Sequence, residues 1–287
     1  MLEPTPINYT LVSPSKVGAY AACTQRLVWD SDLPPKYTSS KWADFGTVCH
    51  YMTQYKLGCA PPDAPTPEQM ASAATLVGSE DAMVARADMC SDLAIEQLPK
   101  LQAGVSWLAE VPVHDPDLLP ERRSRKDPSK VEGFGGSIDL LSTNRAKIVD
   151  LKFPTRPPSE FKVEYVWQLA SYAMLTGVHE THILWVMSTG KSFYSATINW
   201  SDTRFAPFIP RVRKFVERCG HKHFRDYVYP TAGSHCQYCD HKERCPLSYV
   251  PPPQLGSRVT QDTDNGWLDK LVAKATNKAI NSAEPLF

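Results

Sequence analysis

A polar pair, Asn144–Arg145, between two apolar segments constrains this chain more than any other part of its sequence. The flanking segments, 135–143 and 146–152, are rich in Ile, Leu and Val, and β-branched residues are typical of strands. Such a pattern predicts a β-hairpin, and a two-residue loop sets its register. In that register Asp139 lies directly opposite Asp150.

The two opposed aspartates would repel each other, because directly opposed side chains have Cβ atoms about 4.5–5.5 Å apart. Strand alternation puts Lys152 on the same face as Asp150. Four apolar residues are expected on the other, buried face: Ile138, Leu140, Val149 and Leu151. Two facing acids with a nearby lysine are expected of a divalent-metal site that activates a water or a phosphate. The alternative is a solvated face on which these charges pair at the surface.

Length and composition indicate a globular chain. Of its 287 residues, 42% are hydrophobic and 22% are charged, and this length can hold one elaborated domain. No apolar run reaches the roughly 18 residues of a transmembrane helix, and the first residues lack the pattern of a secretory signal. We therefore expect no membrane contact and a cytoplasmic location, in a bacterium or in the host of a phage. The formal net charge of zero neither demands nor excludes a polyanionic partner.

Helix and strand signals alternate along the chain. Helices are expected at 13–23, 45–55, 68–98, 160–177 and 201–220, and strands at 105–113, in the hairpin, at 181–189 and at 192–200. This order predicts an α/β or α+β fold with a central mixed β-sheet flanked by helices. Residues 66–100 would form a helical insertion, and residues 251–287 a tail that is partly disordered.

The eight cysteines favour metal binding over disulfides in a cytosolic chain. Four of them are candidate ligands: Cys23 near the start, and Cys236, Cys239 and Cys245 near the end. Their spacing is compatible with zinc, for which His235 or His241 could be the fourth ligand. Spacing alone slightly favours zinc, and an iron–sulfur cluster held by four thiolates is the other reading. The remaining cysteines are expected to be packing residues: Cys49, Cys59, Cys90 and Cys219.

Five motifs, in this order, resemble those of the PD-(D/E)XK nuclease superfamily, and within it the RecB-like branch that includes the CRISPR-associated iron–sulfur nuclease and the AddB nuclease domain. They are Gly46-Thr-Val-Cys-His50, Gly-Ser-Ile-Asp139, Asp150-Leu-Lys152, Gln168-Leu-Ala-Ser-Tyr172, and the split cysteine set of residues 23 and 236–245. Any one of these motifs is weak, because short patterns recur by chance. Together they cover roughly residues 13–247.

The resemblance implies a restriction-endonuclease-like core in a single nuclease domain, residues 1–250, with a [4Fe–4S] cluster on Cys23, Cys236, Cys239 and Cys245 joining its two ends. It implies that Mg²⁺ or Mn²⁺ is held by His50, Asp139, Asp150 and the backbone carbonyl of Leu151. Lys152 would position or help to deprotonate the attacking water. Gln168 and Tyr172 would fix the DNA strand or the lysine, and Glu110 is a candidate additional acid.

The expected function is a metal-dependent DNA nuclease, an exonuclease that acts on single- or double-stranded ends in recombination, repair or phage DNA processing. Its expected partners are DNA and a recombination protein. Two alternatives belong to other classes. One is a non-catalytic DNA-binding or complex-forming module that keeps the nuclease fold, and the other is a zinc-stabilised interaction domain without nuclease activity.

Overall fold

The structure is a computed structural model of the chain. It describes residues 12–32, 41–60, 65–72, 80–115, 117–119, 122–123, 131–132, 134–159, 161–221, 224–233, 236, 239–241 and 243–247. The expected tail, residues 251–287, lies outside the described residues, as does His235.

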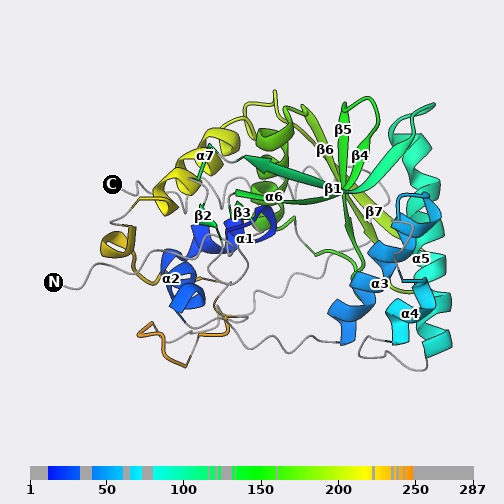
Figure 1. Ribbon diagram of the computed structural model, residues 1–287, viewed down its shortest axis with the longest axis horizontal. Coiled ribbons are helices and arrows are strands. Elements are labelled where there is room, and N and C mark those ends of the chain that lie inside the picture. Colours follow the sequence, from blue (N-terminus) through cyan, green and yellow to red (C-terminus); the bar gives the residue numbers. More distant parts are fainter. Residues whose placement is uncertain are drawn as a thin grey trace.

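A five-stranded sheet in the order β1-β4-β5-β6-β7 forms the centre of the fold (Figure 1). Its strands are β1 Trp107–Asp115, β4 Phe134–Ser142, β5 Lys147–Lys152, β6 Glu180–Val186 and β7 Phe193–Asn199. Strands β5 and β6 are parallel, and the other neighbours are antiparallel. The predicted mixed sheet is therefore confirmed. A separate ribbon pairs β2 Arg122–Arg123 with β3 Val131–Glu132.

Helices cover both faces of the sheet. They are α1 Pro14–Ala22, α2 Thr24–Asp32, α3 Lys41–Lys56, α4 Pro67–Ser72, α5 Glu80–Leu101, α6 Val163–Thr176, α7 Phe208–Cys219 and the short 3-10 helix η2 Phe224–Tyr227. Figure 1 shows α3, α4 and α5 on one side of the sheet, and α1, α6 and α7 on the other. None of these described helices combines the length and apolar character needed to span a bilayer.

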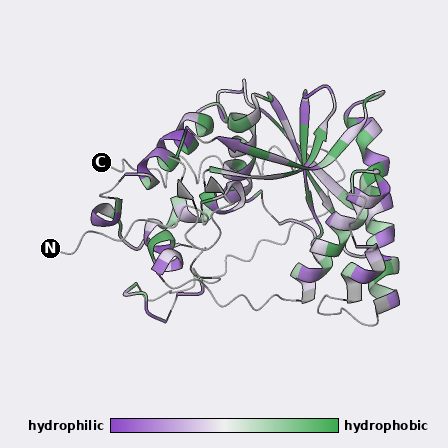
Figure 2. Ribbon diagram, in the orientation of Figure 1, coloured by the Kyte–Doolittle hydropathy of each residue, from purple (hydrophilic) through white to green (hydrophobic). Residues whose placement is uncertain are grey.

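Two hydrophobic cores fill the spaces between the sheet and these helices. In one, Ile148 of β5 packs with Leu169 of α6 and Val212 of α7. In the other, Val149 and Leu151 of β5 pack against α3 and α5. Figure 2 shows hydrophilic and hydrophobic stretches alternating along α7, as expected of a helix with one face on a core. Strand β5 is thus buried on both faces, and the carboxylate of Asp150 is embedded in an apolar strand.

The β4–β5 hairpin has the predicted register, because Leu140 pairs with Val149 and Leu141 with Ile148. Its turn, however, spans residues 143–146 instead of two residues. The hydroxyl of Ser142 explains the difference, since it accepts the N–H groups of residues 146 and 147 at 3.1 and 2.9 Å. The Ser142 side chain therefore replaces part of the backbone hydrogen bonding at the turn, and the register of the two strands is unchanged.

The two strands of the hairpin separate at Asp139. Their backbone pairing ends at Leu140 and Val149, and the N–H of Leu151 donates instead to Asp139 Oδ2 at 2.7 Å. As a result Ile138 lies in the core with α6, whereas Leu140 lies in the core with α3 and α5. The expectation that these two residues share one face is wrong, because regular alternation does not continue through Asp139, where the pairing with both neighbouring strands is interrupted.

The predicted helix ends are mostly correct. Ser13 is the N-cap of α1 with Pro14 at its first position, and Gly177 ends α6 with φ 73°, a conformation that glycine adopts without strain. The helix expected over 201–220 begins only at Phe208. The carboxylate of Asp202 accepts the N–H of Arg204 at 2.9 Å, and this local bond stabilises a turn in place of a helix.

A buried histidine in β6 gives the fold a dependence on pH. The side chain of His182 is 3% exposed, with Nε2 2.9 Å from Glu180 Oε1 and Nδ1 2.9 Å from Thr197 Oγ1. Burial lowers the pKa of His182 to about 4, although Glu180 opposes this effect and Lys147 adds to it. Because the unfolded histidine has a pKa of about 6.5, the unfolded state binds more protons between these values.

Stability should therefore fall as the pH decreases from 6.5 to 4. We expect the His182→Gln variant to lack this contribution, which amounts to about 3 kcal/mol at most. Urea unfolding gives the free energy of unfolding of both proteins across this pH range. The difference between the two proteins removes the contribution of the acidic residues that both contain. An identical pH dependence in the two proteins would contradict the prediction.

Candidate active site

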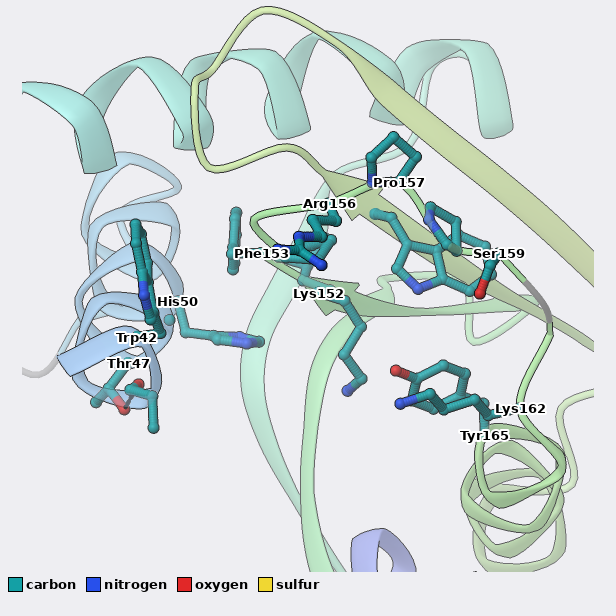
Figure 3. Close-up of a pocket in the computed structure, with 16 residues that line it drawn as sticks. Trp42, Thr47, His50, Lys152, Phe153, Arg156, Pro157, Ser159, Lys162 and Tyr165 are labelled. Atoms are coloured by element: carbon teal, nitrogen blue, oxygen red, sulfur yellow. Dashed lines mark hydrogen bonds between the residues drawn. The ribbon is translucent and has the colours of Figure 1, made fainter. Parts of the chain in front are cut away.

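Acidic and basic side chains from α3, β4 and β5 meet at the point where the hairpin strands separate. Lys152 Nζ lies 2.6 Å from Asp150 Oδ2, and that carboxylate is 1% exposed. His50 Nδ1 lies 3.6 Å from Asp139 Oδ1. In Figure 3, His50 extends from α3 toward the side chain of Lys152. The structure thus brings together the histidine, the two acids and the lysine that the sequence motifs single out.

Burial determines the charge states of these groups. Burial raises the pKa of Asp139 and of Asp150 to about 6 each, although Lys152 opposes the rise. Burial also lowers the pKa of His50 to about 4, and Lys152 lowers it further. The imidazole is therefore neutral at pH 7 and keeps a lone pair for a ligand. Burial alone would lower the pKa of Lys152, but Asp150 and Asp139 outweigh it and keep the ammonium charged.

Glu110 joins this cluster through an unusual backbone conformation. One donor atom each from His50, Glu110 and Asp139 lie within 4.8 Å of one another. Glu110 has φ 51°, a left-handed value that residues other than glycine rarely adopt. The regular pairing of β1 with β4 is interrupted there, between the pairs formed by residues 109 and 111. Backbone strain of this kind clusters at functional sites, where neighbouring structure holds it in place.

Asp150 lies outside this triad and is held by protein groups. Its Oδ1 accepts a hydrogen bond from Gln168 Nε2 at 2.7 Å, and its Oδ2 pairs with Lys152. The predicted ligand set of His50, Asp139, Asp150 and the carbonyl of Leu151 thus shares its first two members with the triad. Glu110 was only an additional candidate in the sequence, where its one signal is an acid between apolar strand residues.

Helix α6 supports both strands of the hairpin from one face. Gln168 and Tyr172 are four residues apart, so they lie one turn apart on the same side of the helix. Gln168 bonds to Asp150, while the hydroxyl of Tyr172 donates to the carbonyl of Ser137 at 2.7 Å. Ser137 in turn donates to Glu110 at 2.7 Å. These two α6 residues therefore contact an acid and the β4 backbone, and their expected role in fixing the DNA strand or the lysine stays a prediction.

The donor set fits a hard divalent cation. Carboxylate oxygens are the ligands that Mg²⁺ prefers, and an imidazole is compatible with Mn²⁺. The raised pKa values of Asp139 and Asp150 mean that their buried charges are only partly compensated by Lys152. A cation bound between His50, Glu110 and Asp139 would supply the missing positive charge.

The cysteine motif unites two distant parts of the chain. Cys23 lies between α1 and α2. Burial raises the pKa of Cys239, and the nearby thiols of Cys23 and Cys236 contribute to the rise. Cys245 is half-buried in the same C-terminal segment. Residues more than two hundred positions apart are therefore neighbours in space.

Polar contacts hold this C-terminal segment on α2. His241 Nε2 hydrogen-bonds to Asp30 Oδ1, and Arg26 lies 3.8 Å from Asp240. The His241 ring also contacts Trp29 edge-on, with ring centroids 5.6 Å apart. His241 is therefore engaged by α2, which argues against its role as a zinc ligand. The other cysteines are packing residues as expected: Cys49, Cys90 and Cys219 are buried and Cys59 is half-buried.

The sequence profile of the PD-(D/E)XK nuclease superfamily matches residues 11–246. This range contains the sheet, the acidic cluster and the cysteine motif. The chain belongs to the PD-(D/E)XK nuclease superfamily. Family and site together define a metal-dependent DNA nuclease with the restriction-endonuclease-like α/β fold.

Solved structures of other proteins show weak similarity. SSO0001 is 13% identical, with 83% of this chain and 87% of that chain covered and a TM-score of 0.41. LHK-Exo, an alkaline exonuclease from Laribacter hongkongensis solved with dAMP, is 14% identical, with 74% and 86% covered and a TM-score of 0.36. A phage-related exonuclease from Haemophilus somnus 129PT is 13% identical, with 75% and 95% covered and a TM-score of 0.33. No curated protein matches the sequence.

Proposed function

We propose that this nuclease is an exonuclease that cleaves DNA from strand ends with Mg²⁺ or Mn²⁺. The observation that carries the proposal is the convergence of His50, Glu110 and Asp139 next to the Asp150–Lys152 pair. The resemblance to RecB-like nucleases supports the action on ends. It also supports a cytoplasmic role in recombination, repair or phage DNA processing, together with a recombination protein.

The proposed metal ligands are His50, Glu110 and Asp139, with Asp150 and the carbonyl of Leu151 completing the set. A bound divalent cation would polarise the scissile phosphate and acidify the attacking water. Asp139 has a second task in the protein, because its Oδ2 accepts the N–H of Leu151 and fixes the orientation of the carboxylate. A carboxylate fixed in this way needs little reorganisation when the substrate binds.

Lys152 has the proposed role of stabilising charge at the phosphate. Its ammonium group lies between a buried acid and the ring of Tyr165, whose centroid is 5.8 Å from Nζ. From this position it can donate a hydrogen bond to the attacking water and offset the negative charge that develops on the phosphate. Gln168 holds Asp150, and Tyr172 holds β4, so both act as positioning residues.

Metal removal tests the proposal. We expect no cleavage of end-labelled linear DNA in EDTA, and full recovery when excess Mn²⁺ or Mg²⁺ is added. Covalently closed circular DNA should remain intact under the same conditions, because it has no ends. Cleavage of both substrates at similar rates would indicate an endonuclease. Absence of cleavage with either metal would favour the non-catalytic DNA-binding module.

We also propose that Cys23, Cys236, Cys239 and Cys245 hold a [4Fe–4S] cluster, which places the chain in the RecB-like branch. The proximity of Cys239 to Cys23 and Cys236 supports a shared site. Four thiolates are the usual ligands of such a cluster. The engagement of His241 by Asp30 favours a ligand set of cysteines alone. A single tetrahedral zinc on the same four sulfurs is the alternative.

A further inference from the structure

A cavity of about 680 Å³ opens directly beside the acidic cluster. Figure 3 shows it between α3, which carries Trp42 and His50, and the start of α6, which carries Tyr165, with Lys152 between the two sides. His50 and Lys152 belong both to the cavity wall and to the proposed site. A ligand in the cavity is therefore adjacent to the position of the scissile phosphate.

The lining of the cavity is cationic and aromatic. Lys152, Arg156 and Lys162 contribute positive charge, and the residues that line it include no Asp or Glu. Arg156 and Lys162 are exposed, and within the described ranges no carboxylate forms an ion pair with either of them. Their charges are thus available to an anionic ligand, which can accept hydrogen bonds from both side chains when it enters the cavity.

Trp42 contributes an aromatic side chain to the lining of this cavity. Its side chain lies at the start of α3 and is 38% exposed. One edge contact holds it in place, with the rings of Trp42 and Phe45 6.1 Å apart between centroids. By contrast Trp185, which also lines the cavity, is buried and contacts the rings of Phe161 and Tyr165 edge-on. An exposed indole that lines the same cavity as Arg156 and Lys162 is a combination that binds a nucleotide, through base stacking and phosphate contacts.

We infer that this cavity holds an unpaired nucleotide of the strand that is cut, with its phosphate on Arg156 and Lys162 and its base on Trp42. The inference rests on the proposed nuclease function and specifies its substrate. Bases within a duplex present only their edges in the grooves, whereas stacking on an indole requires a free face. The volume lies in the range of about 300–1,000 Å³ typical of small-ligand sites, which suits one or two nucleotides. The enzyme therefore selects single-stranded or frayed ends.

Binding of a short fluorescein-labelled oligothymidylate, followed by fluorescence anisotropy, tests the role of Trp42. All variants carry Asp150→Asn, so that the oligonucleotide is not cut. Adding Trp42→Ala should weaken binding roughly 5- to 100-fold, the range expected for the loss of one stacked base. Phe193→Ala is the matched control, because Phe193 of β7 is also 38% exposed and lies outside the cavity. Affinity for a blunt duplex should not change in either variant.

The two cations are tested by the salt dependence of the same binding reaction. The double variant Arg156→Gln/Lys162→Gln should reduce the slope of log affinity against log salt by about 0.7, because each single-strand phosphate that the protein neutralises contributes about 0.7. The control Arg145→Gln/Lys214→Gln removes the same charge from exposed positions in the β4–β5 turn and in α7. An equal reduction in the control would indicate diffuse attraction and overturn the assignment.

Different experimental outcomes would contradict the cavity assignment and the nuclease assignment. If the wild-type protein cuts linear DNA with Mn²⁺ while the cavity variants bind single strands as tightly as their Asp150→Asn parent, the cavity assignment is wrong and the nuclease assignment stands. If the wild-type protein cuts no DNA, the nuclease assignment itself is wrong. Equal loss of duplex and single-strand binding in Trp42→Ala would also overturn the cavity assignment.

Discussion

The Asp150→Asn variant is expected to cut DNA about 10³-fold more slowly than the wild-type protein, or not at all. Asparagine keeps the size of the side chain and its contact with Gln168, but it removes the charge that faces Lys152. The variant therefore has one fewer anionic group to hold a cation and leaves the lysine without its closest partner. A metal ion contributes several kcal/mol of transition-state stabilisation, and each 1.36 kcal/mol corresponds to about tenfold in rate.

Initial rates on end-labelled linear DNA, measured over a range of Mn²⁺ concentrations, provide the comparison. The matched control is Asp88→Asn, which removes an acid of α5 that pairs with Lys56 at 2.7 Å and is 49% exposed. The control should retain wild-type rates, and thermal melting should show that both variants are folded. A folded Asp150→Asn protein with wild-type rates and metal dependence would exclude the assigned site.

The Cys239→Ser variant is expected to lose the visible colour of an iron–sulfur protein and several kcal/mol of unfolding free energy. A cluster that joins residue 23 to residues 236–245 closes a loop of more than two hundred residues in the unfolded chain. The entropy of closing so long a loop corresponds to about 5 kcal/mol. Loss of the cluster removes this restriction, so α2 and the C-terminal segment should become the first regions to exchange their amide hydrogens.

Anaerobic purification, iron and sulfide analysis and urea unfolding measure these effects. Cys59→Ser serves as the control because Cys59 is also half-buried but lies outside the motif, bonding weakly to the carbonyls of Leu57 and Trp107. It should keep the colour and most of the stability. If the wild-type protein is colourless and contains zinc but no iron, the iron–sulfur assignment is wrong and the zinc site is the correct one.

Local sequence patterns could predict much of this fold and part of its site. The polar break at Asn144–Arg145 between two apolar segments correctly aligned Leu140 with Val149, and that alignment brings the two aspartates together. Helical spacing correctly placed Gln168 and Tyr172 on one face of α6. In both cases the information lies within a few residues of the element itself, where periodicity is a direct consequence of backbone geometry.

Other features depend on contacts that no local pattern encodes. The left-handed φ of Glu110 has no signature in the flanking residues, because strain is sustained by the neighbouring strand and not by propensity. The bond between Asp30 and His241 joins residues from opposite ends of the chain. The partners of Gln168 and Tyr172 likewise depend on how α6 packs over the separated hairpin strands. The motifs contain the functional groups, but tertiary packing decides what each of them contacts.

The Asp139 carboxylate has two roles, because it accepts the hydrogen bond from the Leu151 N–H in the sheet and is also a proposed ligand of the cation. One of its oxygens completes the β4–β5 pairing, while the other faces His50 at 3.6 Å. A cation bound at Oδ1 fixes the carboxylate, and this must stabilise the hydrogen bond from Leu151 to Oδ2 and with it the hairpin. Thermodynamic reciprocity requires the converse, so any perturbation that frays this hairpin, even at its distant turn, lowers the affinity for the ion by the same free energy.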